Sequence, residues 1–374
     1  MRVLYLIRAE LHIYPPCLSQ ILYLNELCVD VTVAYGGCDE KVKTMLENKG
    51  IKCVDLQINR NHSSSCELLL SIAKYRRQVS RFLKEHFHTC DLLWFGTADS
   101  GFLVRARDLK DKNFVLSVLE LYDKNKLYLK GIGRIICRAA AVICCERTRA
   151  DIMRCWWELK ETPFVMPNKP YAHPNEKNMA GTIAETSEII KKFGSSFGII
   201  YQGIFSKDRD LSNLACALKE LEQDIVLYLM GSDPGGYCEK IKTVYEKTVY
   251  LGYVPAPFHL EVTSHAQVGI ALYDYSSLNN LFCAPNKIYE YAGFGIPIIG
   301  NDVHGLRETI GKYEAGICVN FDSVDEIKDA LLRIMNDYER YSENAKEFYL
   351  STDNRETVRI IVNKLNNLGQ EVGA

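Results

Sequence analysis

The chain alternates between short apolar runs and longer segments with helical periodicity, and this alternation is the feature that most limits its fold. In the first half, the apolar runs lie at residues 2–7, 30–35, 52–58, 91–96, 113–120 and 140–145. Helical patterns follow them, for example at 16–27, 39–49 and 66–88. Continuous apolar strands that alternate with helices are typical of a parallel sheet covered on both faces. The first half therefore predicts an α/β domain.

The alternation stops once and then resumes. Residues 166–178, "MPNKPYAHPNEKN", contain three prolines and three asparagines, which is typical of a linker. The apolar runs return at 197–203, 225–231, 247–252, 266–273, 296–300 and 315–321, and after about residue 323 the pattern is only helical. We therefore predict an α/β protein with two Rossmann-like, doubly wound parallel-sheet domains, residues 1–167 and 196–340, facing a cleft. Residues 168–195 are the expected linker.

Length, charge and cysteine usage exclude several classes of protein. The 374 residues suit two domains of this type, and a formal net charge of −2 does not fit a globally basic nucleic-acid binder. The N-terminal apolar run is too short for a signal peptide, and no run approaches the roughly 20 apolar residues that span a bilayer. The 14 cysteines form no CxxC pair or zinc-like cluster. We expect a cytoplasmic protein without a metal, with at most peripheral membrane contact.

In open parallel sheets ligands bind beyond the carboxyl ends of the strands, so we expect the binding residues in the loops that follow the strands. After the run 197–203, Gly203 permits a tight turn, and Lys207 and Arg209 precede a helix that starts near Asp210. Cations beside a helix N-terminus suit a phosphate, although a solvated turn is the alternative. The D-x-D spacing around Arg209 also resembles a metal site, but helix capping by Asp210 is the preferred interpretation.

The segment 284–300, "APNKIYEYAGFGIPIIG", carries the strongest signal. Pro285 favours a helix start at 285–286, which places Lys287 in the first turn, where a cation opposes the helix dipole unless an anion compensates it. Glu290 lies on the same face, and a carboxylate can accept both hydroxyl hydrogens of a ribose diol. Gly293 and Gly295 end the helix. The alternative is an exposed Lys–Glu pair worth only a few tenths of a kcal/mol.

The order of these motifs resembles the C-terminal domain of GT-B glycosyltransferases, and more narrowly the group 1 (family 4) enzymes that use nucleotide sugars. The matching segments are "YQG" before Arg209, "MGSDPG", "VYLGYVP", "GIALY", "APNKIYEYAGFGIPII" and "NDVHGLRETI". Upstream, "AAVICCERTRADIM" and "TPFVMPNKP" are similar to the family's segment that leads to the linker. Residues 341–374 look like the family's helices that pack back toward the N-terminal domain. The resemblance covers essentially the whole chain.

The resemblance implies a role for individual residues. The donor diphosphate would be bound by Arg209 and Lys287, the ribose by Glu290, and the base by the loops at Gly231 and at Tyr253–Val254. The sugar would lie near Asn279–Pro285. The expected donor-binding residues are Gly203, Arg209, Gly231, Tyr253, Val254, Asn279, Pro285, Asn286, Lys287 and Glu290.

One departure from the family pattern concerns the sugar. Retaining members usually carry two glutamates separated by seven residues, and the first of them touches the donor sugar. Counting back from Glu290 gives Phe282 at that place. The sugar contact and the stereochemistry therefore stay open, with retention favoured over inversion.

The first domain has no GxGxxG or P-loop, so a dinucleotide site is disfavoured. Glu10 and His12 follow the first strand and face the expected cleft, although a solvated loop histidine is the commoner case. Glu120 ends an apolar run, where burial at a cleft edge raises a carboxyl pKa, so it is a candidate general base or acceptor ligand. Asp123 is the second candidate for this general base or acceptor ligand. The catalytic candidates are Glu120, Arg209 and Lys287.

A basic segment at 124–138 follows. Lys126, Lys130, Arg134 and Arg138 recur every fourth residue and form one stripe if the segment is a single helix. Such a stripe suits anionic lipid or an anionic, lipid-linked acceptor. The alternative is a solvated face, and the glycines at 131 and 133 weaken the helix.

Together these features predict a glycosyltransferase that moves a sugar from a nucleoside-diphosphate sugar, with UDP or GDP as the nucleotide, to an acceptor hydroxyl. The acceptor is expected to be a lipid-linked glycan or a surface polysaccharide at the inner face of the cytoplasmic membrane, and no further cofactor is required. Two alternatives share the donor chemistry. One is a sugar-nucleotide epimerase of the same fold, and the other is a non-catalytic protein that binds nucleotide sugars.

Overall fold

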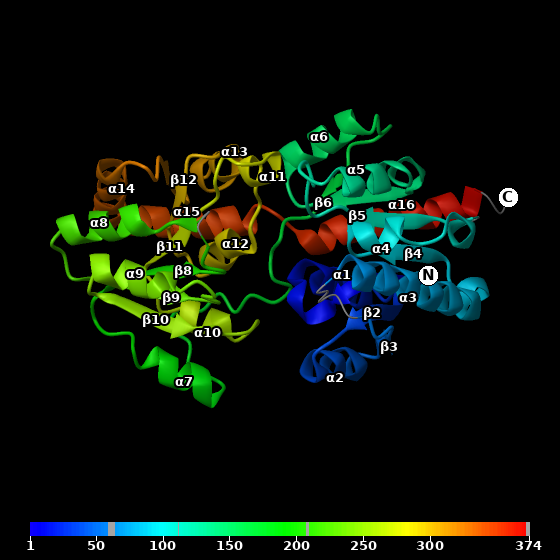
Figure 1. Ribbon diagram of the computed structural model, residues 1–374, viewed down its shortest axis with the longest axis horizontal. Coiled ribbons are helices and arrows are strands. Elements are labelled where there is room, and N and C mark those ends of the chain that lie inside the picture. Colours follow the sequence, from blue (N-terminus) through cyan, green and yellow to red (C-terminus); the bar gives the residue numbers. More distant parts are fainter. Residues whose placement is uncertain (59–63, 111, 207–208, 372–374) are drawn as a thin grey trace. The chain divides into compact units, whose positions relative to one another are not determined.

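The computed structural model describes residues 1–58, 64–110, 112–206 and 209–371, and the chain forms two compact units (Figure 1). The first unit comprises Met1–Tyr171 together with the chain from Asp353 onward, and the second comprises Ala172–Thr352. The expected linker, residues 168–195, therefore includes the junction between the units as well as the helix α7 (Ala184–Ile190).

The first unit contains one parallel sheet of seven strands in the order β3-β2-β1-β4-β5-β6-β7. Six of these strands overlap the apolar runs of the sequence, which confirms that prediction, while the seventh is only two residues long and was missed. The strands are β1 (Arg2–Glu10), β2 (Asp30–Gly37), β3 (Lys52–Asp55), β4 (Leu92–Phe95), β5 (Phe114–Ser117), β6 (Ala141–Cys144) and β7 (Phe164–Val165).

Both faces of this sheet are buried, as the continuous apolar strands require. Alternate strand residues such as Tyr5 and Trp94 join one core cluster, while their neighbours Leu6 and Phe95 are buried on the other face. The helices of the unit are α1 (Pro15–Glu26), α2 (Glu40–Asn48), α3 (Ser65–His86), α4 (Ala98–Phe102), α5 (Lys126–Gly133), α6 (Arg147–Trp156) and α16 (Asn354–Glu371).

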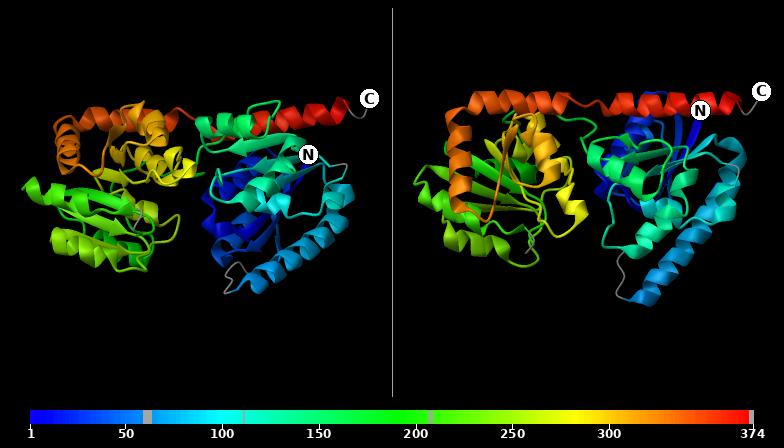
Figure 2. Two further views of the ribbon diagram at one scale, coloured as in Figure 1. Left: turned by 45° about the horizontal axis from the view of Figure 1, so that its top comes forward. Right: turned by 90° about the horizontal axis from the view of Figure 1, so that it is seen from above.

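The C-terminal helix α16 belongs to the core of the first unit, although it is the last element of the chain (Figure 2). Val358 and Ile361 are fully buried in the same cluster as α1 and the strands. At the start of the helix, Asn354 donates a hydrogen bond from Nδ2 to the carbonyl oxygen of Pro167 (2.8 Å). The preceding helix, α15 (Tyr338–Leu350), lies within the second unit.

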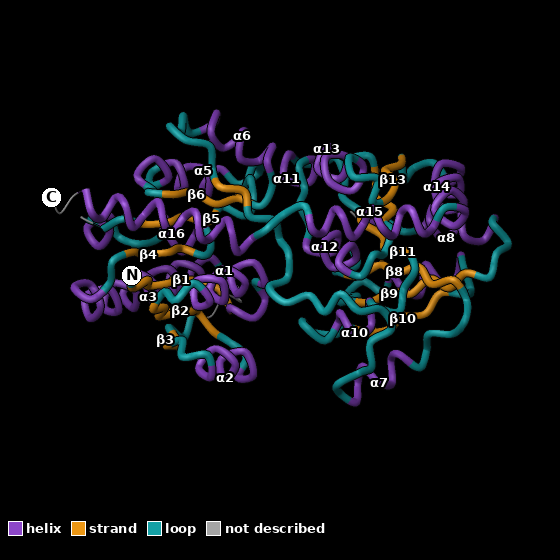
Figure 3. The backbone as a smooth tube through the Cα atoms, turned by 180° about the vertical axis from the view of Figure 1, so that it is seen from behind, coloured by secondary structure: helices purple, strands orange, loops and turns teal. Residues whose placement is uncertain are grey.

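The second unit contains a parallel sheet of six strands in the order β10-β9-β8-β11-β12-β13 (Figure 3). All six expected strands are present: β8 (Phe197–Gln202), β9 (Ile225–Met230), β10 (Thr248–Gly252), β11 (Val268–Ala271), β12 (Ile298–Asn301) and β13 (Gly316–Val319). One buried cluster includes α12 and α15 on one face of the sheet, and another includes α8 and α14 on the other face.

The remaining helices of the second unit connect these strands, and they complete a doubly wound arrangement. They are α8 (Ser212–Glu220), α9 (Tyr237–Val244), α10 (His259–Thr263), α11 (Leu278–Leu281), α12 (Asn286–Gly293), α13 (His304–Leu306) with a π-helical turn (Arg307–Gly311), and α14 (Val324–Asn336). The helical pattern expected after residue 323 is confirmed by α14, α15 and α16.

The expected single basic helix across 124–138 is wrong. Helix α5 ends at Gly133, with Arg134 as its C-cap, and Arg138 lies in a separate 3-10 turn (Ile136–Arg138). Gly131 has no room for a side chain, because a Cβ atom there would meet the ring of Phe102 at 2.7 Å. The four cations therefore do not form one helical stripe, although the side chains of all four are exposed.

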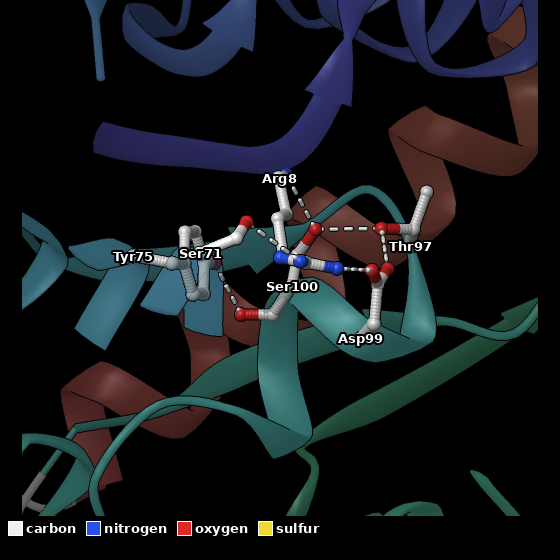
Figure 4. A network of polar contacts seen from close by, with 6 residues as sticks. All are labelled: Arg8, Ser71, Tyr75, Thr97, Asp99 and Ser100. Carbon is white, nitrogen blue, oxygen red and sulfur yellow. Dashed lines mark hydrogen bonds and ion pairs between the residues drawn. The ribbon is translucent and has the colours of Figure 1, made fainter. Parts of the chain in front are cut away.

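A buried polar network fixes the carboxyl ends of β1 and β4 in the first unit (Figure 4). The guanidinium of Arg8 forms an ion pair with Asp99 (3.1 Å) and donates to Ser71 Oγ (3.1 Å), and both charged residues are 3% exposed. Thr97 donates to Asp99 Oδ1 (2.7 Å), and the backbone N–H of Arg8 donates to Ser100 Oγ (2.8 Å). The network joins α3 and α4 to the carboxyl ends of two inner strands.

Substitution of Ile361 by Ala should destabilise the first unit by about 2–5 kcal/mol, because it removes a fully buried side chain from the core. The matched control is the neighbouring Ile360, which is 46% exposed, and its replacement by Ala should change stability by less than about 0.5 kcal/mol. Urea unfolding of the full chain measures both effects. Equal effects of the two substitutions would show that α16 does not contribute to the core.

Candidate functional site

Helix α12 begins and ends where its sequence predicts. Pro285 is the N-cap residue with extended backbone angles (φ −73°, ψ 148°), and the first helical residue is Asn286. At the other end, Gly295 has a φ of +65°, and its N–H donates to the carbonyl of Ala292 (2.8 Å) while Ile296 N–H donates to that of Tyr291 (3.1 Å). These two bonds form a Schellman motif, which needs glycine at the left-handed position. The predicted start at 285–286 and the glycine end are confirmed.

Tyr291 anchors α12 against the sheet. Its ring fills the space beside Gly269 of β11, where a Cβ atom would lie 2.3 Å from the ring. Its buried hydroxyl oxygen accepts a hydrogen bond from the backbone N–H of Gln202 (3.2 Å), at the end of β8. This contact brings the first turn of α12 to the carboxyl ends of β8 and β11, where the strand order of the second sheet reverses.

Lys287 is buried without a hydrogen-bond partner for its ammonium group among the described residues. Its Nζ lies 4.2 Å from the centre of the Tyr201 ring. A Cβ atom on Gly203 would lie 3.2 Å from Lys287 Nζ and 3.8 Å from Arg209 Nη1, so the two cations converge on the backbone of this glycine. The structure therefore brings together Gly203, Arg209 and Lys287.

The electrostatics of this cluster are unfavourable without an anion. Burial, followed by repulsion from Arg209, lowers the pKa of Lys287 from 10.5 to about 7, and the attraction of Glu290 only partly opposes this shift. A buried cation that lacks a hydrogen-bonded counter-ion is costly. A bound anion that touches both cations would remove that cost, and a phosphate has the oxygens to do so.

Arg209 reaches the site from the loop after β8, and its guanidinium carbon lies 5.3 Å from the centre of the Tyr273 ring. Lys207 lies outside the described residues. Asp210 accepts a hydrogen bond from the backbone N–H of Ser212 (2.9 Å), the first residue of α8. The N-cap residue of this helix is Leu211, so the expected capping by Asp210 is wrong by one residue. Within the described residues, no group of three or more His, Cys, Asp and Glu side chains is placed to hold a metal ion.

Glu290 lies one turn along α12, and two side chains contact its carboxylate. Its Oε1 lies 3.2 Å from His259 Nε2, and its Oε2 accepts a hydrogen bond from the side-chain amide of Gln202. Gln202 in turn accepts from the hydroxyl of Thr263 (2.7 Å). Burial raises the pKa of Glu290, but His259 and Lys287 outweigh this effect, so that the pKa falls below its usual value and the carboxylate stays ionised at neutral pH.

The alternative of an exposed Lys287–Glu290 ion pair is wrong. Each residue is 7% exposed, and the ammonium of Lys287 makes no hydrogen bond to the carboxylate. The helix was expected to place both side chains on one face, but they contact different neighbours. Lys287 faces Gly203 and Arg209, while Glu290 faces His259 and Gln202.

Sequence reasoning missed four residues around Glu290, namely His173, Gln202, His259 and Thr263. Gln202 stands directly before Gly203 in the motif "YQG", so the motif could have predicted it as a site residue. His259 and Thr263 lie one helical turn apart on α10, which gives a weak signal. His173 lies in the expected linker, and its Nε2 is 2.8 Å from the backbone oxygen of Glu290.

The glycine loops of the second unit approach each other closely. Gly231 has a φ of +145°, and a Cβ atom there would lie 1.8 Å from the backbone oxygen of Gly203. Only glycine fits this position. In the next loop Tyr253 is 61% exposed and Val254 is buried. Asn279 lies half-buried on α11.

Phe282 follows α11, and its ring packs edge-on against His304 (5.1 Å between ring centres). This residue stands where the family pattern has its first glutamate. The place is therefore occupied by an aromatic pair formed by Phe282 and the first residue of α13.

The acceptor-side candidates all lie in the first unit. Glu10 ends β1, and its carboxylate lies 3.5 Å from His12 Nε2, while His12 Nδ1 accepts from the backbone N–H of Asp39 (3.2 Å). Asp123 is half-buried. Lys126, Lys130 and Arg134 are exposed on α5 and its C-cap.

One expectation about Glu120 is wrong. It was placed at the end of a buried strand, but β5 ends at Ser117 and Glu120 is exposed. Its expected role as a general base depended on burial that the first unit does not provide.

The second unit matches a known family. Residues 197–337 match the family model described as glycosyl transferases group 1. This match covers the segment whose motifs carried the resemblance, and it confirms that resemblance for the second unit. A comparison with curated protein sequences gave no match.

Solved structures resemble the chain along its whole length. Sucrose-phosphate synthase from Thermosynechococcus elongatus has 16% identity and a TM-score of 0.66, covering 100% of this chain and 98% of that one. Anabaena Alr3699/HepE in complex with UDP-glucose has 15% identity and a TM-score of 0.68, covering 99% and 100%. The apo form of the lipopolysaccharide outer core galactosyltransferase WaaB has 15% identity and a TM-score of 0.66, covering 97% and 99%. At these identities the likeness establishes the fold, which is the expected GT-B fold.

Raising the pH from about 7 to about 9 should weaken diphosphate binding at this site by about tenfold or more. Lys287 has a pKa of about 7 in the free protein and is increasingly neutral above it. An adjacent diphosphate favours the protonated form, so binding takes up a proton, and affinity falls as pH rises. Over this range the ligand's own terminal phosphate is already ionised. Calorimetry with UDP and GDP measures the effect.

The control is Lys287→Met, which should bind these nucleotides weakly and with little dependence on pH. An affinity of the unmodified protein that is constant across this range would contradict the assignment of Lys287 to the diphosphate.

Proposed function

We propose that this chain, which has the GT-B fold and a second unit that matches the group 1 glycosyltransferases, transfers a sugar from a nucleoside-diphosphate sugar to an acceptor hydroxyl. The observation that carries this proposal is the buried ammonium of Lys287, which has no hydrogen-bond partner in the part of the chain that the structure describes and converges with Arg209 on the backbone of Gly203. Two adjacent cations at the carboxyl edge of a parallel sheet suit a diphosphate. The ionised carboxylate of Glu290, one helical turn away, suits the ribose that such a diphosphate carries.

The chemistry of the second unit is mainly electrostatic. As the sugar leaves the donor, negative charge develops on the diphosphate, and Lys287 and Arg209 neutralise it. The N-terminus of α12, which begins at Asn286, adds the positive end of a helix dipole. The absence of a side chain at Gly231 lets its loop pack directly against the backbone of Gly203, and this contact fixes the loop beside the two cations.

The remaining assignments follow the resemblance. The loops at Gly231 and at Tyr253–Val254 hold the base, and the sugar lies near Asn279–Pro285. The nucleotide of the donor is UDP or GDP. HepE, which has the same fold, is described in complex with UDP-glucose. Retention of configuration is favoured over inversion.

The acceptor side belongs to the first unit. Asp123 is the preferred acceptor ligand or base, since Glu120 lacks the burial expected of it. The acceptor is a glycan or a lipid-linked glycan used in polysaccharide biosynthesis at the inner face of the cytoplasmic membrane. WaaB, another protein of this fold, is described as a lipopolysaccharide outer core galactosyltransferase. Among the described residues, none of the helices has the length and apolar character needed to cross a bilayer.

Incubation of the purified protein with a panel of UDP- and GDP-sugars tests the proposal. Slow release of the nucleoside diphosphate that increases when a glycan or lipid-linked acceptor is added supports transfer. Release of a free, epimerised sugar nucleotide would instead support an epimerase, and tight binding without turnover would support a non-catalytic binding protein.

Lys287→Met should weaken binding of the matching nucleoside diphosphate by about tenfold or more, because it removes a charge-assisted hydrogen bond. The matched control is Lys312→Met, since Lys312 is an exposed residue of the same unit. Calorimetric titration measures both variants. Unchanged affinity in Lys287→Met would exclude the diphosphate assignment.

Changing Lys126, Lys130 and Arg134 together to Glu should reduce binding to anionic vesicles by about tenfold or more, because each basic residue near such a surface contributes about 1 kcal/mol. Leu127, which is 81% exposed, adds an apolar contact beside them. A vesicle sedimentation assay measures this effect, with neutral vesicles as the reference.

The control variant carries Glu at Lys41, Lys49 and Lys52, which are exposed elsewhere on the first unit. If both triple variants lose vesicle binding equally, the interaction reflects net charge rather than this surface.

A further inference from the structure

His259 contacts the carboxylate of Glu290 through one ring nitrogen, while its other ring nitrogen has no hydrogen-bond partner among the described residues. It is the first residue of α10, and its side chain is 15% exposed. Its Nε2 lies 3.2 Å from Glu290 Oε1, while its Nδ1 is buried and has no hydrogen-bond partner among the described residues. Buried polar atoms are nearly always hydrogen-bonded, and leaving one unpaired destabilises the fold. The atom is therefore expected to have a partner in the working protein.

The neighbouring carboxylate determines what that partner must be. Glu290 is ionised, so its oxygens can only accept hydrogen bonds, and the ring nitrogen that faces it must carry the proton. In the neutral imidazole the other nitrogen, Nδ1, then has a free lone pair and is an acceptor. Its missing partner is a hydrogen-bond donor.

The acceptor atoms around Glu290 are held rigidly. The side-chain amide of Gln202 donates to Glu290 Oε2, and the hydroxyl of Thr263 fixes that amide by donating to its oxygen (2.7 Å). His259 and Thr263 lie one turn apart on α10, so a single short helix supports both sides of the carboxylate. Rigid acceptors discriminate strongly between ligands that have the matching donor and those that lack it.

We propose that His259 Nδ1 and the carboxylate of Glu290 form a pair of acceptors for the two vicinal hydroxyls of a ribose, and that His259 thereby makes the site selective for ribonucleotides over deoxyribonucleotides. A ribose presents two adjacent hydroxyl donors, and a deoxyribose has lost one of them. Each acceptor takes one hydroxyl hydrogen. The inference rests on the proposed function, since it deepens the same donor site.

The position of Lys287 is consistent with this arrangement. Lys287 precedes Glu290 by one helical turn on α12, and its ammonium lies on the side of Gly203 and Arg209. A diphosphate at these cations and a ribose at Glu290 would follow each other along the helix, in the order in which a nucleotide connects them. His259 then lies on the ribose side of the site.

A matched pair of substitutions separates the two ring nitrogens. His259→Gln places an amide near the former Nε2, so the contact with Glu290 is retained and the acceptor at Nδ1 is lost. His259→Asn places its amide near the former Nδ1, so the acceptor is retained and the contact with Glu290 is lost. A purely structural role for His259 would change the affinity for ribo- and deoxyribonucleotides equally in each variant.

The experiment is a calorimetric titration of the full chain with UDP and GDP and with their 2′-deoxy and 3′-deoxy analogues. The unmodified protein should prefer the ribonucleotide over at least one deoxy analogue by about tenfold. His259→Gln should lose most of this preference while keeping its affinity for that deoxy analogue. His259→Asn should bind all of them more weakly and keep the preference.

The outcomes distinguish the inference from the proposed function. If the unmodified protein binds none of these nucleotides, the proposed function itself is wrong. If it binds them but shows no preference for ribose, or if His259→Gln keeps the full preference, only the role of His259 is wrong. Melting temperatures of the two variants identify any loss of folding, and the preference is read from whichever variant retains the native melting temperature.

Discussion

The packing of α12 against the second sheet is the contact on which the candidate site depends. Gly269 of β11 leaves room for the ring of Tyr291, and the hydroxyl oxygen of that tyrosine accepts the backbone N–H of Gln202 at the end of β8. One residue of slippage would rotate the helix by about 100° and carry Lys287 and Glu290 away from the strand ends. The N-cap at Pro285 and the glycine end prevent such slippage, since they fix where the helix starts and stops.

In both sheets polar groups lie where the strand order reverses, but the partners of these groups differ between the two sheets. In the first sheet, Arg8 at the end of β1 forms an ion pair with Asp99 and donates to Ser71 Oγ, although its Nε has no hydrogen-bond partner among the described residues. In the second sheet, Lys287 and Arg209 converge, and no carboxylate of the described residues is hydrogen-bonded to the Lys287 ammonium. A buried ion pair needs no ligand, whereas a buried cation without a counter-ion does. The contrast explains why the anion is expected in the second unit.

The sequence predicts the fold well because burial of the strands on both faces produces continuous apolar runs. Of the thirteen strands in the described residues, twelve overlap such runs. The bounds of α12 were also predictable, since proline and glycine act locally. The cluster around Glu290 was not, because His173, Gln202 and His259 come from three segments that meet only after folding. The prediction for 124–138 was wrong because it relied on the regular spacing of the basic residues. Gly131 is in close contact with Phe102, and the helix ends soon after it, at Gly133.

Helix α10 connects the candidate site to the segment that joins the two units. His259 and Thr263 face the carboxylate of Glu290 and its partner, while Glu261, between them, accepts hydrogen bonds from the backbone N–H of Thr182 (3.0 Å) and the hydroxyl of Thr186 (2.6 Å). A helix of five residues is not stable alone, so contacts on both sides determine its position. The expected linker is therefore largely part of the scaffold of the second unit. This agrees with the position of the junction near residue 171, close to the start of the expected linker rather than at its end.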